Sequence, residues 1–192
     1  MIKASYDDKK RIVDILRQSF DTNKSVNYII PQDSKREKRI AALMDYSFEL
    51  CYQFGEVYLS DDKNACALIM LPEQKKTNLK AILLDAKMVF SCTGLGNVKK
   101  ALDREAKVKA LLPQEAIYYL WFIGVDPAHA HQGIGSHLLN EVIAVGNAMG
   151  RPICLETSTE RNIPWYQRHG FHIYNELTLS YKLSFLRREP SK

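Results

Sequence analysis

The sequence predicts an α/β fold, with a mixed central sheet flanked by helices. The apolar run over 116–125 is typical of a central strand covered on both faces, and residues 133–149 carry apolar side chains at helical spacing. A further apolar run at 153–157 gives the order strand, helix, strand, which forms a parallel crossover. Predicted hairpins before and after this unit add antiparallel strands, so the sheet is mixed.

The first part of the chain begins with a short predicted strand, 2–5, and an amphipathic helix, 7–20, with acidic residues in its first turn. Residues 22–34 show no period and are predicted to form a loop, with a plain surface connection favoured over a loop that covers a substrate pocket. A second amphipathic helix is expected over 35–54, ended by Gly55 in a left-handed conformation.

A hairpin follows, with strands 56–60 and 65–71 on either side of a polar turn. Two helices are predicted over 78–90 and 97–111, separated by the glycine-bearing stretch 94–96. Because that stretch follows a helix rather than a strand, we expect no phosphate-binding role for it.

The chain ends with a short helix within 160–169, where Pro164 suits a first helical turn, and with antiparallel strands at 171–174 and 177–185. Gly124, inside the first apolar run, predicts a bulge or a closely approaching ligand. A length of 192 residues is typical of one domain, so we expect a single domain over 1–192.

Hydrophobic residues make up 46% of the chain, enough for a sizeable core. No apolar run approaches the ~20 residues of a membrane span, and the N-terminus lacks the apolar segment of a signal peptide. We therefore expect a cytoplasmic protein without a membrane partner, with its four cysteines as small core residues. The net charge of +5 comes from scattered basic pairs. A nucleic-acid-binding protein more often has a continuous basic stripe, so the charge suits a small polyanion at least as well, and we expect no nucleic-acid partner.

Between the predicted central strand and the next helix lies a glycine-bearing loop, 131–136. Such a loop and the first turn of the helix point unpaired N–H groups at one spot, which favours phosphate. Gly133 and Gly135 leave room for an anion to approach the backbone, although two glycines suit a plain turn equally well. The loop has neither the third glycine of the dinucleotide fingerprint nor the Lys-Ser/Thr of a Walker loop. The predicted phosphate therefore belongs to another ligand.

The segment Val-Asp-Pro at 125–127, followed by Gln-Gly-Ile-Gly-Ser-His-Leu-Leu at 132–139, resembles motif A of the GCN5-related N-acetyltransferases (GNAT). Residues 166–171, Tyr-Gln-Arg-His-Gly-Phe, resemble the Tyr-x-x-x-Gly-Phe element of the same family. Within the family, residues in 155–166 are similar to a segment of puromycin N-acetyltransferases. The resemblance is specific for 120–171. It implies the GNAT acyl-CoA N-acyltransferase fold, with parallel strands at the cofactor cleft.

The resemblance implies acetyl-CoA as the donor, a primary amine of a small molecule as the acceptor, and direct transfer in a ternary complex. It implies that the pyrophosphate binds the loop and that the pantetheine pairs with the end of the preceding strand. No metal is expected, and a monomer or a homodimer is expected. The implied acetyl-CoA-binding residues are Phe122, Ile123, Gly124, Val125, His131, Gln132, Gly133, Ile134, Gly135, Ser136, Asn162 and Tyr166.

One position departs from the family pattern. The family usually has Arg or Gln three residues before the first motif glycine, where this chain has Ala130. Backbone donors need no side chain, and His131 or Gln132 is a candidate to compensate. Loss of one charged hydrogen bond typically costs ~1.5–3 kcal/mol, which is about ten-fold or more in CoA affinity. The departure motivates an alternative function, a CoA-binding regulatory module without turnover.

By its position in the family motif, Tyr166 is the candidate that stabilises the leaving thiolate. A phenol has a pKa of about 10 and a thiol of about 8.5, so hydrogen-bond donation is favoured over full proton transfer; packing of a buried ring is the alternative. Glu156, at a strand end, is the first candidate for the general base, with a salt-bridge role as the alternative. Glu160 and His129 are weaker candidates.

Tyr118 and Trp121 are candidates for lining the acceptor pocket, with core packing as the alternative. The histidines of the loop region are not expected to bind a metal, because a loop that holds pyrophosphate leaves no room for one. No cysteine lies in a loop beside a recognisable base, so an acyl-enzyme route is not expected. The residues that select the acceptor are expected in the stretches 21–34 and 78–110.

Overall fold

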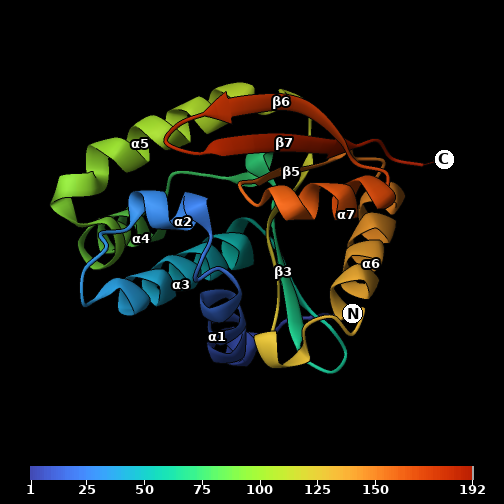
Figure 1. Cartoon of the computed structure of the whole chain (residues 1–192), viewed down its shortest axis with the longest axis horizontal. Coiled ribbons are helices and arrows are strands. Elements are labelled where there is room, and N and C mark those ends of the chain that lie inside the picture. Colours follow the sequence, from blue (N-terminus) through green and yellow to red (C-terminus); the bar gives the residue numbers. More distant parts are fainter. Residues whose placement is uncertain (192) are drawn as a thin grey trace.

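The computed structural model describes residues 1–191, apart from the side chain of Leu95. One seven-stranded sheet runs through the molecule in the order β1-β2-β3-β4-β5-β7-β6, and β4 and β5 are its parallel pair (Figure 1). The prediction of a mixed α/β sheet flanked by helices is therefore confirmed. The strands are β1 (Ile2–Lys3), β2 (Gly55–Leu59), β3 (Ala65–Met70), β4 (Tyr118–Val125), β5 (Ile153–Thr157), β6 (His172–Thr178) and β7 (Lys182–Arg188).

Helices cover both faces of this sheet. Helices α1 to α4 pack on one face, α6 and α7 pack on the other, and α5 lies along β6 and β7 (Figure 1). A π-helical turn, Val89–Thr93, joins α4 to α5. The helices are α1 (Lys9–Ser19), α2 (Lys24–Ile29), α3 (Arg36–Phe54), α4 (Leu79–Met88), α5 (Gly94–Leu111), α6 (Ile134–Ala148) and α7 (Ile163–Arg168).

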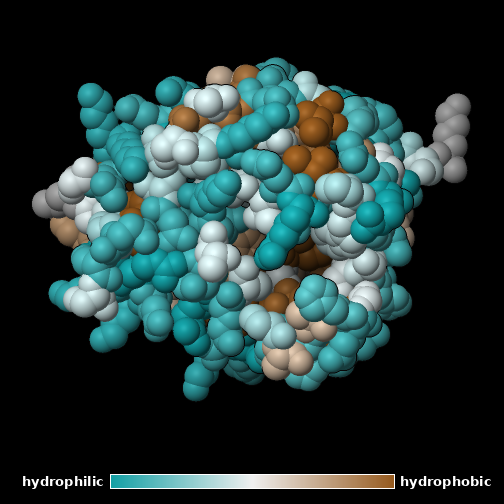
Figure 2. Space-filling model, viewed as in Figure 1, coloured by the Kyte–Doolittle hydropathy of each residue, from teal (hydrophilic) through white to brown (hydrophobic). Residues whose placement is uncertain are grey.

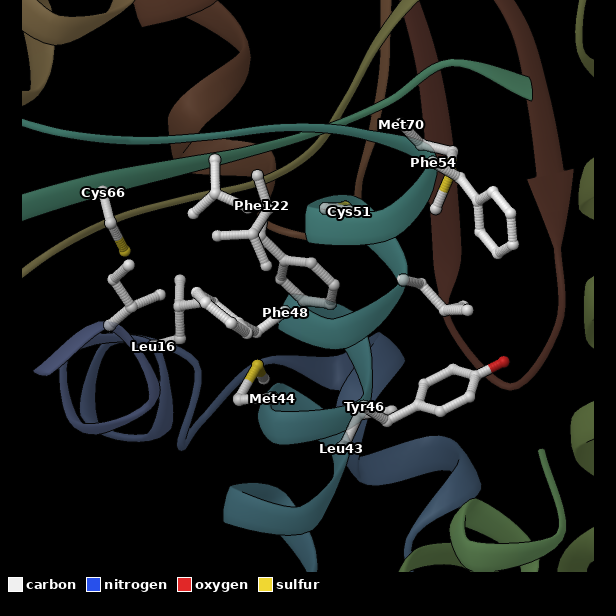
Figure 3. Packing of buried hydrophobic residues seen from close by; sticks show 14 of the residues in the cluster. Leu16, Leu43, Met44, Tyr46, Phe48, Cys51, Phe54, Cys66, Met70 and Phe122 are labelled. Atoms are coloured by element: carbon white, nitrogen blue, oxygen red, sulfur yellow. The ribbon is translucent and has the colours of Figure 1, made fainter. Parts of the chain in front are cut away.

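Strand β3 shows how the sequence divides the core between the two faces. Successive side chains of a strand point to opposite sides, so Cys66 and Leu68 pack with α1 and α3, whereas Ala67 and Ile69 pack with α6. On the first face, Met44 and Phe48 of α3 point toward the sheet (Figure 3). All four cysteines are buried and unpaired by disulfides, as expected for core residues.

The predictions for residues 22–34 and for Gly55 are wrong. Residues 22–34 contain α2, which begins where the Asn23 side chain accepts a hydrogen bond from the Val26 N–H at 3.0 Å; one and a half turns are too short to give a visible period. Gly55 has a φ of −169°, which is extended rather than left-handed. A Cβ there would lie 2.1 Å from the Ile69 carbonyl oxygen, so close strand pairing requires the glycine.

Strand β4 carries a bulge at Trp121, because Leu68 pairs with Phe122 while Ile69 pairs with Leu120. Trp121 and Phe122 consequently both point to the α1–α4 face, and the alternation is inverted beyond them. The bulge predicted at Gly124 therefore lies three positions earlier. Gly124 instead permits the approach of α1, since a Cβ there would lie 2.5 Å from Ser19 Oγ.

The parallel pair separates soon after it forms. Strands β4 and β5 pair at Tyr118 with Ile153 and at Tyr119 with Cys154, and no further. Beyond these positions the strands diverge, and their free ends face one another across an opening.

No single helix within residues 1–191 is both long and apolar enough to cross a membrane. The pair Leu79–Thr93 and Gly96–Leu111, bent by 119° at the break between them, meets the requirements of length and composition only when its two parts are taken together.

Candidate functional site

A cleft of about 990 Å³ opens where β4 and β5 diverge. Its walls come from the end of α1 and the start of α2, from both strand ends, from the loop before α6 and from α7. The hollow with an apolar floor between α1 and α7 is visible in Figure 2. The structure thus brings together segments that are more than a hundred residues apart in the chain.

The loop before α6 ends at the cleft with free N–H groups. Asp126 accepts hydrogen bonds from the N–H groups of Ala128 and His129, at 3.0 and 2.8 Å. After Ala130, none of the N–H groups of residues 131–136 donates a hydrogen bond to any group in residues 1–191. Unpaired donors at a helix N-terminus carry partial positive charge, so this turn is suited to bind an anion.

The glycines of the loop serve two different purposes. Gly133 has a φ of +80°, and a Cβ there would meet nothing within 4 Å, so the space before it is open. Gly135 allows α6 to approach the strand end, since a Cβ there would lie 3.1 Å from Val125 Cγ2. His131 also has a positive φ, +63°, which is uncommon for a non-glycine residue.

Most residues predicted to bind acetyl-CoA lie on the cleft, and three do not line it. Phe122 points to the α1–α4 face of the sheet and packs edge-on against Phe20, with ring centroids 5.0 Å apart. Gln132 is exposed, and Ile134 packs into the core beneath the loop. The lining residues are Ile123, Gly124, Val125, His131, Gly133, Gly135, Ser136, Asn162 and Tyr166.

Helix α7 is tied to the start of α6, because Trp165 Nε1 donates a hydrogen bond to Ser136 Oγ at 2.8 Å. Tyr166 lines the cleft beside it and packs edge-on against Phe171. Burial raises the pKa of the Tyr166 phenol above its ordinary value. The phenol therefore stays protonated and keeps its hydrogen for donation to an acceptor.

Glu156 also lines the cleft, and it forms a buried ion pair with Arg104 of α5. The same guanidinium donates to Ser25 Oγ at 2.6 Å and to the Tyr181 hydroxyl at 3.1 Å. Burial alone would lower the pKa of Arg104, but Glu156 and Tyr181 outweigh it and raise that pKa. The second carboxylate oxygen of Glu156, Oε2, is buried and makes no hydrogen bond of normal geometry within residues 1–191, while the buried Tyr119 phenol interacts with the same carboxylate. Glu156 therefore combines the predicted salt-bridge role with one oxygen free for a ligand.

The remaining candidate site residues divide into those that line the cleft and those that do not. Glu160 and Trp121 line the cleft, whereas His129 does not. Tyr118 is fully buried and donates a hydrogen bond to Glu56 at 2.6 Å, so it belongs to the core rather than to a pocket wall.

Sequence reasoning missed Arg104, Asn23 and Ser158. Arg104 lies on a lysine-rich helix and meets its partner 52 residues away, so no local pattern marks it. Lys24 and Arg161 also line the cleft and carry positive charge, which the family pattern would have at residue 130.

Residues 94–173 match the model of a family described as an acetyltransferase (GNAT) domain. This part of the chain is similar to a GNAT acetyltransferase domain. The match includes the cleft-lining loop, β5 and α7, so the predicted acetyltransferase enzyme is confirmed at this level.

Solved structures with the GNAT fold resemble the whole chain. A histone acetyltransferase HPA2 and related acetyltransferase from Corynebacterium glutamicum has a TM-score of 0.75 at 20% identity, covering 100% of this chain and 96% of that one. Arylalkylamine N-acetyltransferase 2 from Aedes aegypti has a TM-score of 0.67 at 13% identity, with coverage of 99% and 98%. A putative phosphinothricin N-acetyltransferase has a TM-score of 0.55 at 14% identity, with coverage of 100% and 98%. These likenesses confirm the fold of the chain, and puromycin-type specificity stays a prediction.

Proposed function

We propose that the protein transfers the acetyl group of acetyl-CoA directly to a primary amine of a small molecule. The observation that carries this proposal is the set of unpaired N–H groups of residues 131–136 at the edge of a cleft between diverging parallel strands. Such a turn suits a diphosphate, and the cleft is large enough for an extended thioester arm.

The donor is expected to bind along the whole cleft. Its pyrophosphate accepts from the N–H groups of the loop, and its pantetheine pairs with the diverging end of β4, whose β5-facing side has no strand partner beyond Tyr119. Asn162 and Tyr166 contact the arm from α7. Because Lys24 and Arg161 line the same cleft, we infer that they offset the charge missing at Ala130.

In the reaction, the amine nitrogen attacks the thioester carbonyl carbon and forms the amide C–N bond. The C–S bond breaks, and its electron pair remains on the CoA sulfur. Tyr166 stabilises that sulfur by hydrogen-bond donation, because its raised pKa disfavours full transfer of its proton. Glu156 Oε2 accepts the proton that the amine nitrogen loses. That proton finally passes to the thiolate, which gives free CoA and returns Glu156 to its ionised form.

The acceptor class follows from the same site. Glu156 offers a buried, unpaired carboxylate oxygen to a nitrogen that carries protons. The name of the Aedes aegypti relative states an arylalkylamine acceptor for that protein, which supports a small-molecule amine here. We keep the single domain over 1–192, the cytoplasmic location and the monomer or homodimer as predictions.

The test is release of free thiol from acetyl-CoA against a panel of primary amines, including aminonucleosides, together with calorimetric titration of CoA. Thiol release that depends on the amine, with formation of the acetylated amine, supports the proposal. Binding of CoA without turnover on any amine would instead identify the regulatory module. Absence of CoA binding would overturn both functions.

A further inference from the structure

A second hollow, of about 90 Å³, adjoins the cleft on the α1–α4 side of the sheet. We call it the side chamber. It lies beside the bulge in β4, which turns Trp121 and Phe122 to the same face, and residues of α2 line it as well. Its lining residues are Phe20, Asn23, Ser25, Val26, Ile29, Leu43, Arg104, Trp121, Phe122, Glu156, Ser158 and Leu183.

The side chamber and the cleft meet at Glu156. Phe20, Asn23, Trp121, Glu156 and Ser158 line both spaces, so a molecule in the chamber reaches the cleft past the Glu156 carboxylate. This is the position that an acceptor needs relative to a thioester held between the diverging strands.

Several polar groups of the chamber form hydrogen bonds with one another. The Ser25 N–H donates to Ser158 Oγ at 3.2 Å, and Ser158 Oγ donates to Asn23 Oδ1 at 3.3 Å. Arg104 is engaged by Ser25 and Glu156. Among residues 1–191, Glu156 Oε2 is the chamber's one buried side-chain oxygen without a partner. An unpaired buried acceptor is costly, so a bound ligand is expected to supply an N–H donor to it.

The remaining wall is apolar and close-fitting. Phe20 packs edge-on against Phe122, and Val26, Ile29, Leu43 and Leu183 complete the lining. A cavity of about 150 Å³ holds benzene, so a chamber of about 90 Å³ holds a smaller carbon group. Charged or strongly polar substituents on the ligand body would find no free partner on this apolar wall.

We propose that the acceptor is a compact aliphatic primary amine. This inference rests on the proposed function. The nitrogen lies at Glu156 Oε2, facing the cleft, and an apolar body of fewer than about six carbons fills the side chamber. Aromatic amines and aminonucleosides exceed this space and are poorer acceptors.

The first experiment measures kcat/KM of the unmodified protein for primary amines of increasing body, from ethylamine through isobutylamine to phenethylamine, at saturating acetyl-CoA. The compact branched amine should exceed phenethylamine by about ten-fold or more, the scale on which a pocket discriminates small changes in apolar size. Equal or higher kcat/KM for phenethylamine would overturn the inference.

The second experiment changes the chamber from α2. Val26→Phe fills it and should lower kcat/KM for isobutylamine by about ten-fold, with the Kd of CoA unchanged. Val26→Ala enlarges it and should shift the preference toward phenethylamine. Val13→Ala is the matched control, because it removes the same two methyl groups from α1 at a position that lines neither the cleft nor the side chamber. It should leave the ratio of kcat/KM for isobutylamine and phenethylamine unchanged.

The outcomes separate this inference from the proposed function. If amines are acetylated but neither Val26 variant changes the ratio between the two amines, the side chamber does not hold the acceptor and the proposed function stands. If no amine is acetylated by any variant, the proposed function itself fails. Val26→Ala alone decides the question should Val26→Phe not fold, as judged by its thermal unfolding midpoint.

Discussion

At the scale of single residues, the raised pKa of Tyr166 comes from burial of its side chain and not from a charged or hydrogen-bonding neighbour. Its ring packs on Phe171 and its side chain lines the cleft, and burial alone raises the pKa of the phenol. An acid weaker than a thiol cannot transfer its proton to a thiolate favourably. The contribution of Tyr166 is therefore a hydrogen bond to the developing negative charge on sulfur.

Removal of that hydroxyl should affect the chemical step more than donor binding. We expect Tyr166→Phe to lower kcat at least about ten-fold, with the Kd of CoA unchanged, because the ring and its packing remain. Steady-state kinetics with a good acceptor and calorimetric titration of CoA measure the two effects. An unchanged kcat would show that the phenol takes no part in the reaction.

Glu156 shows what the sequence can and cannot predict at this scale. Its place at the end of an apolar strand marks it as a candidate, and the structure puts it on the cleft. Its partner Arg104 and the neighbouring Ser25 come from distant helices. Such contacts depend on how helices pack, which no local period records, so the electrostatic setting of Glu156 was not predictable.

At the scale of elements, the unit formed by β4, the loop and α6 is the part of the site that the sequence predicts best. The apolar strand, the two glycines and the helical period each have a local cause, and all three are found where they were expected. Helix α2 and the bulge at Trp121 were missed. Helix α2 is too short to show a helical period of apolar residues. The position of the bulge depends on the register between β3 and β4, which the sequence of one strand does not reveal.

The two glycines that flank α6 allow a matched test of the loop. Gly133 and Gly150 both have positive φ, +80° and +63°, and neither has an atom within 4 Å of an added Cβ. Alanine should cost about 1–2 kcal/mol of unfolding free energy at either position. Only Gly133→Ala should also weaken CoA binding, by about ten-fold.

Urea unfolding and CoA titration of both variants provide the comparison. The Gly150→Ala protein is the control for backbone strain at an end of the same helix. Equal CoA affinity in the two variants would show that the loop amides do not bind the donor.

At the scale of the whole molecule, Glu49 of α3 joins three elements through charge. It accepts from Tyr6 before α1, from Lys9 of α1 at 2.7 Å and from Lys80 of α4 at 3.3 Å. Burial opposes the charge, but Lys9 and Tyr6 outweigh it and lower the pKa of Glu49 to about 2. The helical layer on this face is thus held partly by a carboxylate that remains ionised at low pH.

A lowered pKa predicts the direction of the pH dependence. The contribution of Glu49 to stability is complete above its unfolded pKa of about 4.5 and is lost as the pH falls toward about 2. The free energy of unfolding of the natural protein should therefore exceed that of Glu49→Gln at pH 7, and the difference should shrink below about pH 4.5. Urea unfolding of both proteins across this range measures it, and a constant difference would contradict the assignment.

The short ladder between β4 and β5 has a consequence for the rigidity of the sheet. Within residues 1–191, strand pairing joins the β1–β4 part of the sheet to the β5–β7–β6 part at two paired positions. A thioester arm bound in the gap would hydrogen-bond to the diverging strand end and would add contacts between the two parts of the sheet. Binding of the donor would therefore also stabilise the sheet. Amide hydrogen exchange in β5 should slow when CoA is added. Without CoA, local opening should be more frequent where β4 meets β5.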